Sequence, residues 1–251
     1  MAPVRDSKEV EFQRELEVFR VETETAIQYF YARQAFHLVA AADSRVVAAL
    51  NLAPRFWNTS TSALQLSAMI TLGRIFDPDP KNHSVSRLLS LAQKNLHIFS
   101  KAAISARKRA ESVNADEFLE EYLKTVYEPE PRDIQRLKDL VAVRRKTYES
   151  NYRGVRHQVF AHRSVADRGE IDALFAKTNI GELQKLLTFL ARLHEVLWQL
   201  LYNGRRPVFR PERYSTKHIL SRPSPTHKQP NTQERIAREA QLVLKSLVRE
   251  I

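Results

Sequence analysis

The 251-residue sequence contains no cysteine and only five glycines. Without cysteine there is no disulfide framework, no thiolate metal site and no cysteine nucleophile, which fits a reducing compartment. Few glycines leave few positions for turns that need positive φ, whereas residues that favour helices are common. The sequence therefore predicts an all-α protein, and its 43% hydrophobic content is enough for a sizeable core.

Long apolar runs are also missing. No segment approaches the roughly 18 uninterrupted apolar residues of a membrane span, and residues 1–12 are charged, unlike a signal peptide. The sequence has neither a glycine-rich phosphate loop nor a Gly-x-Ser-x-Gly nucleophile elbow. We expect a soluble, cytoplasmic protein with no cofactor and no membrane partner.

Positive charge is in excess, because 40 Lys and Arg stand against 29 Asp and Glu, a formal charge of +11. Clustered positive charge is typical of a protein that binds a polyanion, since each neutralised phosphate releases counterions. Three clusters occur, at residues 107–109, at Arg144, Arg145 and Lys146, and across residues 205–228. The first two also fit ordinary solvated helix faces, whereas the third holds a single acid.

Apolar residues recur at spacings near 3.6, which predicts a series of helices. The first, over about residues 8–50, is long enough that we expect a bend or break within it, and Pro54 ends it. The further expected helices run from Asn58 or Thr59 to Asp77, from Ser84 to the first basic cluster, from Asn114 to Tyr127, from Pro131 into residues 152–164, and from Asn179 to Gly204.

The C-terminal region changes character. Residues 205–230 hold prolines and basic residues with little apolar periodicity, so we interpret them as an extended linker. Asn231 and Glu234 then form a capping-box pattern for an amphipathic helix over residues 231–251. The predicted organisation is a helical domain at residues 1–204, the linker and the terminal helix, which docks on its own domain, on a second copy or on a partner.

Two patterns suggest a metal ion, and both fit poorly. Residues 77–81 read Asp-Pro-Asp-Pro-Lys, but two prolines exclude a helix and a central strand, and nuclease carboxylates of this kind sit on strands. Zinc motifs on a helix place two histidines four positions apart with a nearby glutamate, whereas His157 and His162 are five apart with no acid between them. We expect no metal.

The best candidate for chemistry is residues 152–164, which read Tyr-Arg-Gly-Val-Arg-His-Gln-Val-Phe-Ala-His-Arg-Ser. The basic residues of this Arg–His stretch are Arg153, Arg156, His157, His162 and Arg163. Six helical steps separate Arg156 from His162 by about 120° around the axis and about 9 Å along it. Both side chains can reach one cleft only if a second helix or a second subunit supplies the opposite wall.

An arginine, a polar residue directly after it and a histidine a few positions on resemble the signature of the HEPN superfamily; here they are Arg156, His157 and His162. Residues 72–77 (Leu-Gly-Arg-Ile-Phe-Asp) and 84–89 (Ser-Val-Ser-Arg-Leu-Leu) are similar to its abortive-infection-associated branch. The resemblance implies a helical bundle. In many members it also implies a metal-independent ribonuclease, whose cleft forms by dimerisation with two Arg–His sets facing each other.

The resemblance gives each residue of the signature a role. His162 would take a proton from a ribose 2′-hydroxyl or protonate the leaving 5′-oxygen, and Arg156 would hold the scissile phosphate. His157 would orient or support the pair. The arginines and lysine expected to bind RNA are Arg153, Arg163, Arg144, Arg145 and Lys146. The expected partners are RNA, a second copy and a cognate antitoxin or other protein of a phage-defence or toxin–antitoxin system.

Two alternatives stay open. A non-catalytic RNA-binding or regulatory member of the same fold would bind RNA in a salt-dependent way without cleaving it. A structural or interaction module would engage a protein partner through its terminal helix, so that deletion of residues 231–251 would abolish association. The signature itself is ambiguous, because two histidines stand where it needs one and Arg153 can take the place of Arg156.

Overall fold

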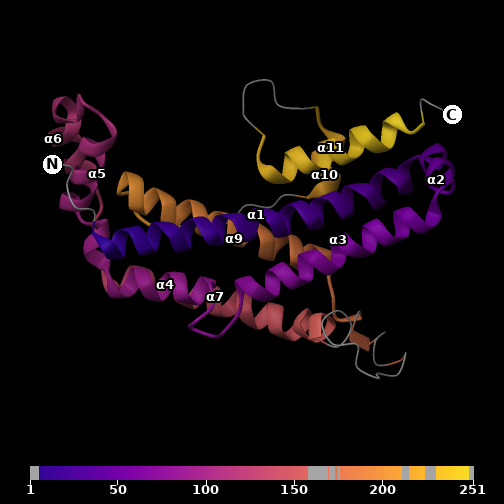
Figure 1. Cartoon of the computed structure of the whole chain (residues 1–251), viewed down its shortest axis with the longest axis horizontal. Helices are drawn as coiled ribbons and strands as arrows, with labels where there is room; N and C mark the ends of the chain where they lie inside the picture. Colours follow the sequence, from indigo (N-terminus) through magenta and orange to yellow (C-terminus); the bar gives the residue numbers. More distant parts are fainter. Residues whose placement is uncertain are drawn as a thin grey trace. The chain divides into compact units, whose positions relative to one another are not determined.

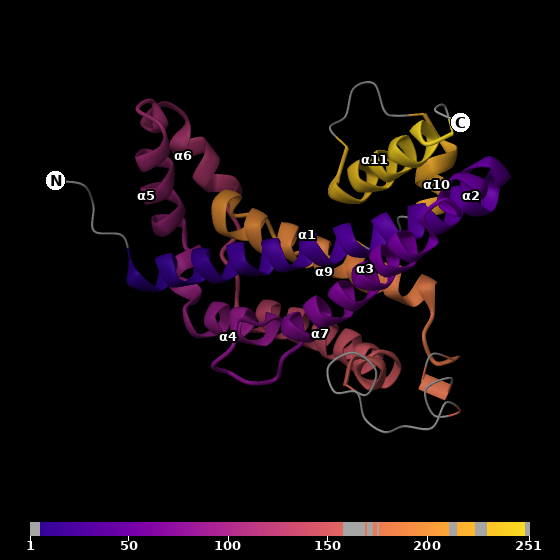
Figure 2. The same cartoon turned by 45° about the vertical axis from the view of Figure 1, so that its right-hand side comes forward.

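The computed structural model describes residues 6–157, 169, 173–174, 176–210, 215–223 and 230–248. These residues form helices and turns with no strand among them, so the all-α prediction is confirmed (Figures 1 and 2). The chain divides into two compact units. Unit 1 comprises Met1–Val21, Arg74–Thr147 and Phe189–Pro211, and unit 2 comprises Glu22–Gly73, Tyr148–Thr188 and Glu212–Ile251.

Four long helices contribute a part to each unit. They are α1 (Ser7–Ala42), α3 (Pro54–Ile75), α7 (Pro131–Asn151) and α9 (Ile180–Asn203). The shorter elements are α2 (Ser44–Leu50), α4 (Val85–Lys94), the 3₁₀ helix η1 (Leu96–Phe99), α5 (Lys101–Glu111), α6 (Ala115–Thr125), α10 (Thr216–Ser221) and α11 (Thr232–Ser246). Among the described residues, no helix is both long enough and apolar enough to cross a membrane.

Unit 1 combines apolar packing with a buried ion pair. Phe12 of α1 meets Phe99 of η1 edge to face, with ring centroids 5.2 Å apart. Arg107 on α5 is 8% exposed, donates to two backbone carbonyls and pairs with Glu9 of α1 at 2.7 Å. Breaking such a pair leaves an uncompensated buried charge. Arg107, the first residue of the first basic cluster, therefore stabilises the fold.

The start of α7 depends on a buried carboxylate. Asp133 is 4% exposed and accepts hydrogen bonds from the Tyr127 hydroxyl at 2.6 Å and from the Glu130 amide at 2.9 Å. Burial raises the pKa of Asp133, but these two hydrogen bonds favour the ionised form, and the net shift is downward from 3.8.

We expect Asp133→Asn to destabilise the protein by about 2 kcal/mol at neutral pH, because two charge-assisted bonds are weakened. A lowered carboxyl pKa contributes stability above the unfolded pKa, and that stability is lost as the pH falls through the folded pKa. The difference in melting temperature between wild type and Asp133→Asn should therefore be largest near pH 7 and shrink as the pH falls below 3.8. A difference that does not vary with pH would contradict this role.

Unit 2 has its own core, and α11 is part of it. One buried cluster consists of Val39 of α1, Val46 and Leu50 of α2, and Leu244 of α11. Trp57 packs against it. The terminal helix therefore docks on its own unit, which the sequence left open. Its removal would uncover this cluster. Other apolar side chains of unit 2 are exposed, namely Val47, Leu52, Phe56, Leu242 and Val243.

Several helix ends follow the predicted caps. Ser84 accepts from the Arg87 amide at 3.4 Å, Asn179 from the Glu182 amide at 3.1 Å and Asn231 from the Glu234 amide at 2.9 Å. Pro131 is the first residue of α7, as predicted. Gly204, at φ +56°, follows the last residue of α9, as a left-handed helix end requires. The break expected in the first helix falls at Asp43, which caps α2.

Three expected boundaries were wrong. α3 begins at Pro54, because proline suits a first helical position, so Asn58 and Thr59 lie inside the helix and do not cap it. The helix after Ser84 ends at Lys94 and is followed by η1 and α5. The short helix α10 lies within the predicted linker, and its Thr216 accepts a hydrogen bond from Gln184 at 3.1 Å.

Candidate functional site

The described part of the Arg–His stretch, residues 152–157, leaves the end of α7 with Tyr152 and Val155 buried. Tyr152 and Val155 are each 1% exposed, whereas Arg153 is exposed and Arg156 is half-buried. The backbone continues as a helical turn, since the Arg156 amide donates to the Tyr152 carbonyl at 3.0 Å, and residues 155–157 wind as a π-helix. Two buried side chains thus fix the direction in which the neighbouring arginines point.

Tyr152 joins this stretch to the start of α9. Its hydroxyl donates to the Asn179 carbonyl at 2.7 Å, and the Asn179 amide donates back to the hydroxyl at 3.4 Å. The Asn179 side chain is the cap of α9. Burial raises the pKa of Tyr152, so the hydroxyl stays neutral and keeps its proton for this bond. Tyr152, one helical turn before Arg156, is therefore held in place by both packing and hydrogen bonding.

Arg156 lies directly against the backbone of α3. A Cβ atom added at Gly73 would fall 2.2 Å from Arg156 Nε, 2.5 Å from Cζ and 2.6 Å from Cδ, far inside any permitted contact. Gly73 does not adopt positive φ, so backbone freedom does not explain the glycine. A helical glycine costs about 1 kcal/mol relative to alanine. Because Gly73 has no side chain, the Arg156 guanidinium can occupy the space beside it.

The electrostatic surroundings of Arg156 contain no counter-anion among the residues that the structure describes. No Asp or Glu there forms an ion pair with Arg156, and its buried Nε has no hydrogen-bond partner there. The nearby Tyr148 is 3% exposed; burial raises the pKa of its hydroxyl, and the positive charge of Arg156 opposes part of that rise. A neutral phenol and a glycine backbone therefore lie beside the guanidinium, and no carboxylate in the described part of the chain pairs with it.

The structure describes part of the predicted site. Arg156 and His157 are both half-buried at the end of the described stretch, and Arg153 is exposed beside them. His162 and Arg163 lie outside the described residues. The distance between Arg156 and His162 therefore stays a prediction from helical geometry.

A comparison with known families identifies the family of this chain. A family model described as AbiU2, of the HEPN type, matches residues 9–220. The chain belongs to the HEPN AbiU2 family. The match includes α3 beneath Arg156 as well as the Arg–His stretch, so the resemblance seen in the sequence is confirmed. Neither a curated protein nor a solved structure matches this HEPN chain significantly.

The second sequence block of the HEPN family has a structural role in this chain. Arg87 on α4 donates to Glu15 at 3.0 Å and to the Pro80 carbonyl at 3.0 Å, and His83 pairs with the other Glu15 oxygen at 2.8 Å. The Glu15 side chain is 1% exposed. This network ties α1, α4 and the loop between α3 and α4 together within unit 1.

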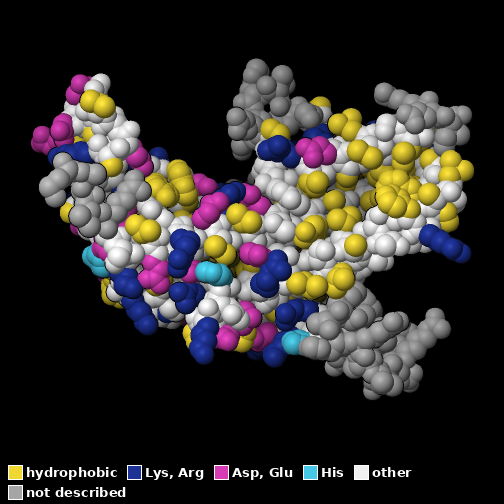
Figure 3. All heavy atoms as spheres, in the orientation of Figure 1, with side chains coloured by type: hydrophobic (Ala, Val, Ile, Leu, Met, Phe, Trp, Pro, Cys, Tyr) yellow, Lys and Arg dark blue, Asp and Glu magenta, His cyan; other side chains and the backbone are white. Residues whose placement is uncertain are grey.

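The basic residues of α7 are partly committed to contacts within unit 1 of the HEPN chain. Arg144 lies over the Phe189 ring at 5.4 Å, and Arg145 donates to the Ser86 hydroxyl. Lys146 is exposed. Figure 3 shows Lys and Arg side chains interspersed with Asp and Glu over α4 and α7 on this face. Of the three, Lys146 is the most exposed.

The Asp-Pro-Asp-Pro loop of the HEPN chain uses its carboxylates locally. Asp77 accepts from the Asp79 amide at 2.9 Å, and Asp79 accepts from the Lys81 amide at 2.9 Å. These are turn-forming bonds of the kind that Asp side chains make after a helix. In the described ranges, no three His, Asp or Glu side chains lie together as metal ligands.

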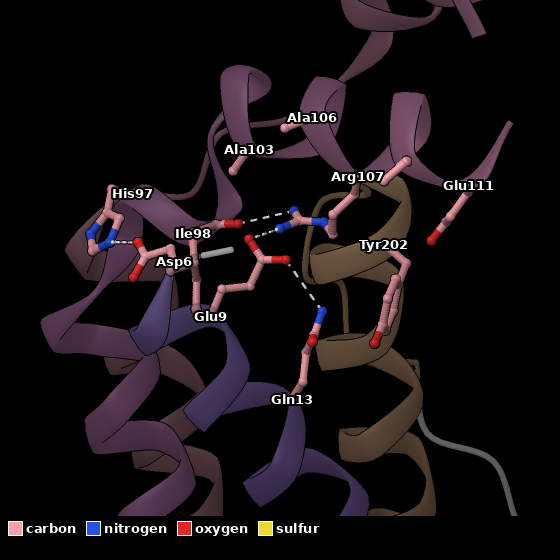
Figure 4. Close-up of a pocket in the computed structure, with 11 residues that line it drawn as sticks. Asp6, Glu9, Gln13, His97, Ile98, Ala103, Ala106, Arg107, Glu111 and Tyr202 are labelled. Carbon is pink, nitrogen blue, oxygen red and sulfur yellow. Dashed lines mark hydrogen bonds and ion pairs between the residues drawn. The ribbon is translucent and has the colours of Figure 1, made fainter. Parts of the chain in front are cut away.

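Unit 1 contains a pocket of about 410 Å³ that is separate from the Arg–His stretch (Figure 4). Asp6 pairs with His97 at 2.7 Å and Glu9 with Arg107 at 2.7 Å, while Gln13 donates to Glu9 at 3.3 Å. Figure 4 shows these two ion pairs, and Glu111, also drawn, pairs with Lys108 at 3.3 Å. Because the charged side chains of this pocket are paired in this way, its charge does not call for a ligand.

Sequence reasoning missed the residues that position Arg156. Gly73 was quoted only as part of a resemblance, although an isolated glycine inside a helical pattern indicates a packing or functional reason. Nothing in the sequence indicates that Tyr148 lies beside Arg156 or that Tyr152 binds Asn179.

Proposed function

We propose that this HEPN protein is a metal-independent endoribonuclease in which Arg156 and His162 act on one phosphodiester. The observation that carries the proposal is an arginine seated on Gly73 with no carboxylate partner among the described residues. Buried or half-buried cations are normally paired, and a planar guanidinium matches a phosphate in shape and charge. A backbone phosphate of RNA would supply the missing anion.

The reaction follows from the chemistry of the two side chains. Neutral His162 takes the proton of a ribose 2′-hydroxyl, because an imidazole with a pKa near 6.5 is largely unprotonated at neutral pH. The 2′-oxygen attacks phosphorus and the bond to the 5′-oxygen breaks. The leaving 5′-oxygen takes a proton from the imidazolium formed on His162, so that a 2′,3′-cyclic phosphate and a 5′-hydroxyl result. Arg156 stabilises the negative charge that builds up on the phosphoryl oxygens. His157 supports the pair.

A second copy would complete the cleft. Helical geometry places Arg156 and His162 about 120° apart, so one helix alone cannot close a site around a phosphodiester. In a dimer the two Arg–His sets face each other across the RNA. Arg153, Arg163 and Lys146 extend the binding surface along the RNA backbone, with Arg144 and Arg145 contributing less. A protein antitoxin would act by covering this surface, as fits a phage-defence or toxin–antitoxin effector.

The proposal is tested by turnover in a chelator. The purified protein should cleave total RNA and transfer RNA with EDTA present, because no step uses a metal ion. The products should end in a 2′,3′-cyclic phosphate, and an all-DNA version of a cleaved oligonucleotide should stay intact because it lacks the nucleophile. Cleavage that stops in EDTA, or that proceeds on DNA, would contradict the mechanism.

RNA binding without turnover is the second candidate function. It is favoured by the same Arg156, which forms no ion pair with a carboxylate of the described residues, since an arginine binds phosphate whether or not a proton is transferred. Salt-dependent RNA binding with no products under any condition would favour this candidate.

A further inference from the structure

A second pocket, of about 230 Å³, lies in unit 2 beside the Arg–His stretch. Its walls come from α1, α3, the start of α9 and the stretch itself. The residues that matter for its chemistry are Arg33 and Gln34 of α1, Gln65 of α3, and Tyr152 and Val155. Its volume is below the roughly 300 to 1,000 Å³ of sites for drug-sized ligands, which suits a single ring system and its phosphate.

The described residues give this pocket a positive charge. Among them, no Asp or Glu lines it, Arg33 forms no ion pair, and its buried Nε has no hydrogen-bond partner. Burial lowers the pKa of Arg33, which shows that the guanidinium is poorly solvated. One turn further, burial and the charge of Arg33 lower the pKa of His37, so this histidine is neutral and adds no charge. The pocket therefore favours an anion.

Two side-chain amides in the pocket also lack partners. Gln34 is 7% exposed, and neither it nor the half-buried Gln65 has a side-chain hydrogen bond among the residues that the structure describes. Neither amide is among the buried unsatisfied groups of the described residues, so each can bind water in the pocket, and a ligand with matching groups would replace that water. Each amide offers donors and an acceptor, which is how glutamine reads the edge of a nucleobase.

The pocket is placed next to Arg156. Val155 lines it and precedes Arg156 in the chain. Met69, which also lines it, lies one helical turn from Gly73 on α3, and Gln65 lies two turns away, which are about 6 and 12 Å along the axis. An RNA strand whose phosphate lies on Arg156 would bring a neighbouring nucleotide to this pocket.

We propose that this pocket binds one nucleotide of the RNA next to the phosphodiester at Arg156, with Arg33 on its phosphate and Gln34 and Gln65 on its base. The inference rests on the proposed function. The same chemistry would accept a free nucleoside monophosphate, and these two sources are separated by experiment.

The test is binding of a fluorescent 2′-fluoro RNA to the full-length chain, because this RNA lacks the attacking hydroxyl and no turnover is needed. Arg33→Met should weaken binding about tenfold or more, equivalent to about 1.4 kcal/mol. Gln65→Leu should also weaken it, while the control Arg55→Met, which removes an exposed arginine of α3 outside the pocket, should change it less than about twofold. If the Arg33→Met and Gln65→Leu variants both bind this RNA as tightly as wild type does, the proposal that the pocket binds a nucleotide is wrong.

Melting temperatures distinguish a variant that has lost the binding site from one that has lost its fold. Without ligand, Arg33→Met should melt at the same temperature as wild type or higher, because an unpaired, half-buried charge is removed. A nucleoside 5′-monophosphate that raises the melting temperature of wild type and not of Arg33→Met would identify the free nucleotide as a ligand. RNA binding that depends on Arg33, with no effect of the monophosphate, would identify RNA.

The outcome for the pocket can be told apart from that for the nuclease. If RNA binding depends on Arg33 but no RNA is cleaved, the pocket stands and the ribonuclease proposal falls. If cleavage depends on Arg156 while Arg33→Met binds and cleaves as wild type does, the ribonuclease stands and the pocket falls.

Discussion

Replacing Arg156 by alanine is expected to slow RNA cleavage about 1,000-fold, the range seen when a charged or oxyanion-stabilising donor is removed from a transition state. The loss should be large because Arg156 itself occupies the space beside Gly73, where the three nearest atoms are its Nε, Cζ and Cδ. Arg156→Lys should recover little, since an ammonium lacks the planar fork that binds two phosphoryl oxygens. Rates are measured under single-turnover conditions in a chelator.

The neighbouring Arg153 is the matched control. It lies three positions earlier, is exposed, and contributes at most a contact to the RNA backbone. Arg153→Ala should therefore slow cleavage less than about tenfold, and the effect should diminish at higher salt. A reversed order, with Arg153 essential and Arg156 dispensable, would show that the signature begins at Arg153.

Gly73→Ala is expected to slow cleavage about 100-fold, although Gly73 is far from the Arg–His stretch in sequence. A displacement of about 1 Å at a catalytic group can lower the rate by this factor. The new Cβ would lie 2.2 Å from Arg156 Nε, so one of the two must move. The Arg156 side chain is the flexible partner. The helix should persist, and alanine should even favour it by up to about 1 kcal/mol.

Two measurements distinguish this displacement from general damage. Ser62→Ala, on an exposed position of the same helix, changes helix propensity without approaching Arg156 and should leave the rate unchanged. In an Arg156→Ala background, Gly73→Ala should have no further effect, because its target is gone. A full loss in that background would mean that Gly73 acts through something other than Arg156.

Local signals in the sequence predicted the helix ends well. Ser84, Asn179 and Asn231 cap helices through their own side chains, and Gly204 ends α9 through its own backbone, so neighbouring residues alone decide these positions. Pro54 was misread because proline both ends one helix and suits the first turn of the next. The resemblance to HEPN proteins added what local signals lack, namely the family and the signature residues.

The contacts that make a site are set by tertiary packing, and the sequence could not give them. Arg107, Arg145 and Arg156 look alike in the sequence, yet one pairs with buried Glu9, one donates to Ser86 and one lies on Gly73 without an anion among the described residues. Nothing in the sequence distinguishes Arg33 from other arginines of a long helix. It lines a pocket only because residues of α3 and of the start of α9 pack beside it.

The most direct test is a double substitution. Residues that act as a unit on one bond show strongly non-additive losses, so the Arg156→Ala, His162→Ala double variant should cleave RNA in chelator no more slowly than the slower single variant. Melting temperatures of all three variants verify that each is folded. Losses that multiply, so that the double variant is slower by the product of the two single effects, would mean that Arg156 and His162 do not act together on the same phosphodiester.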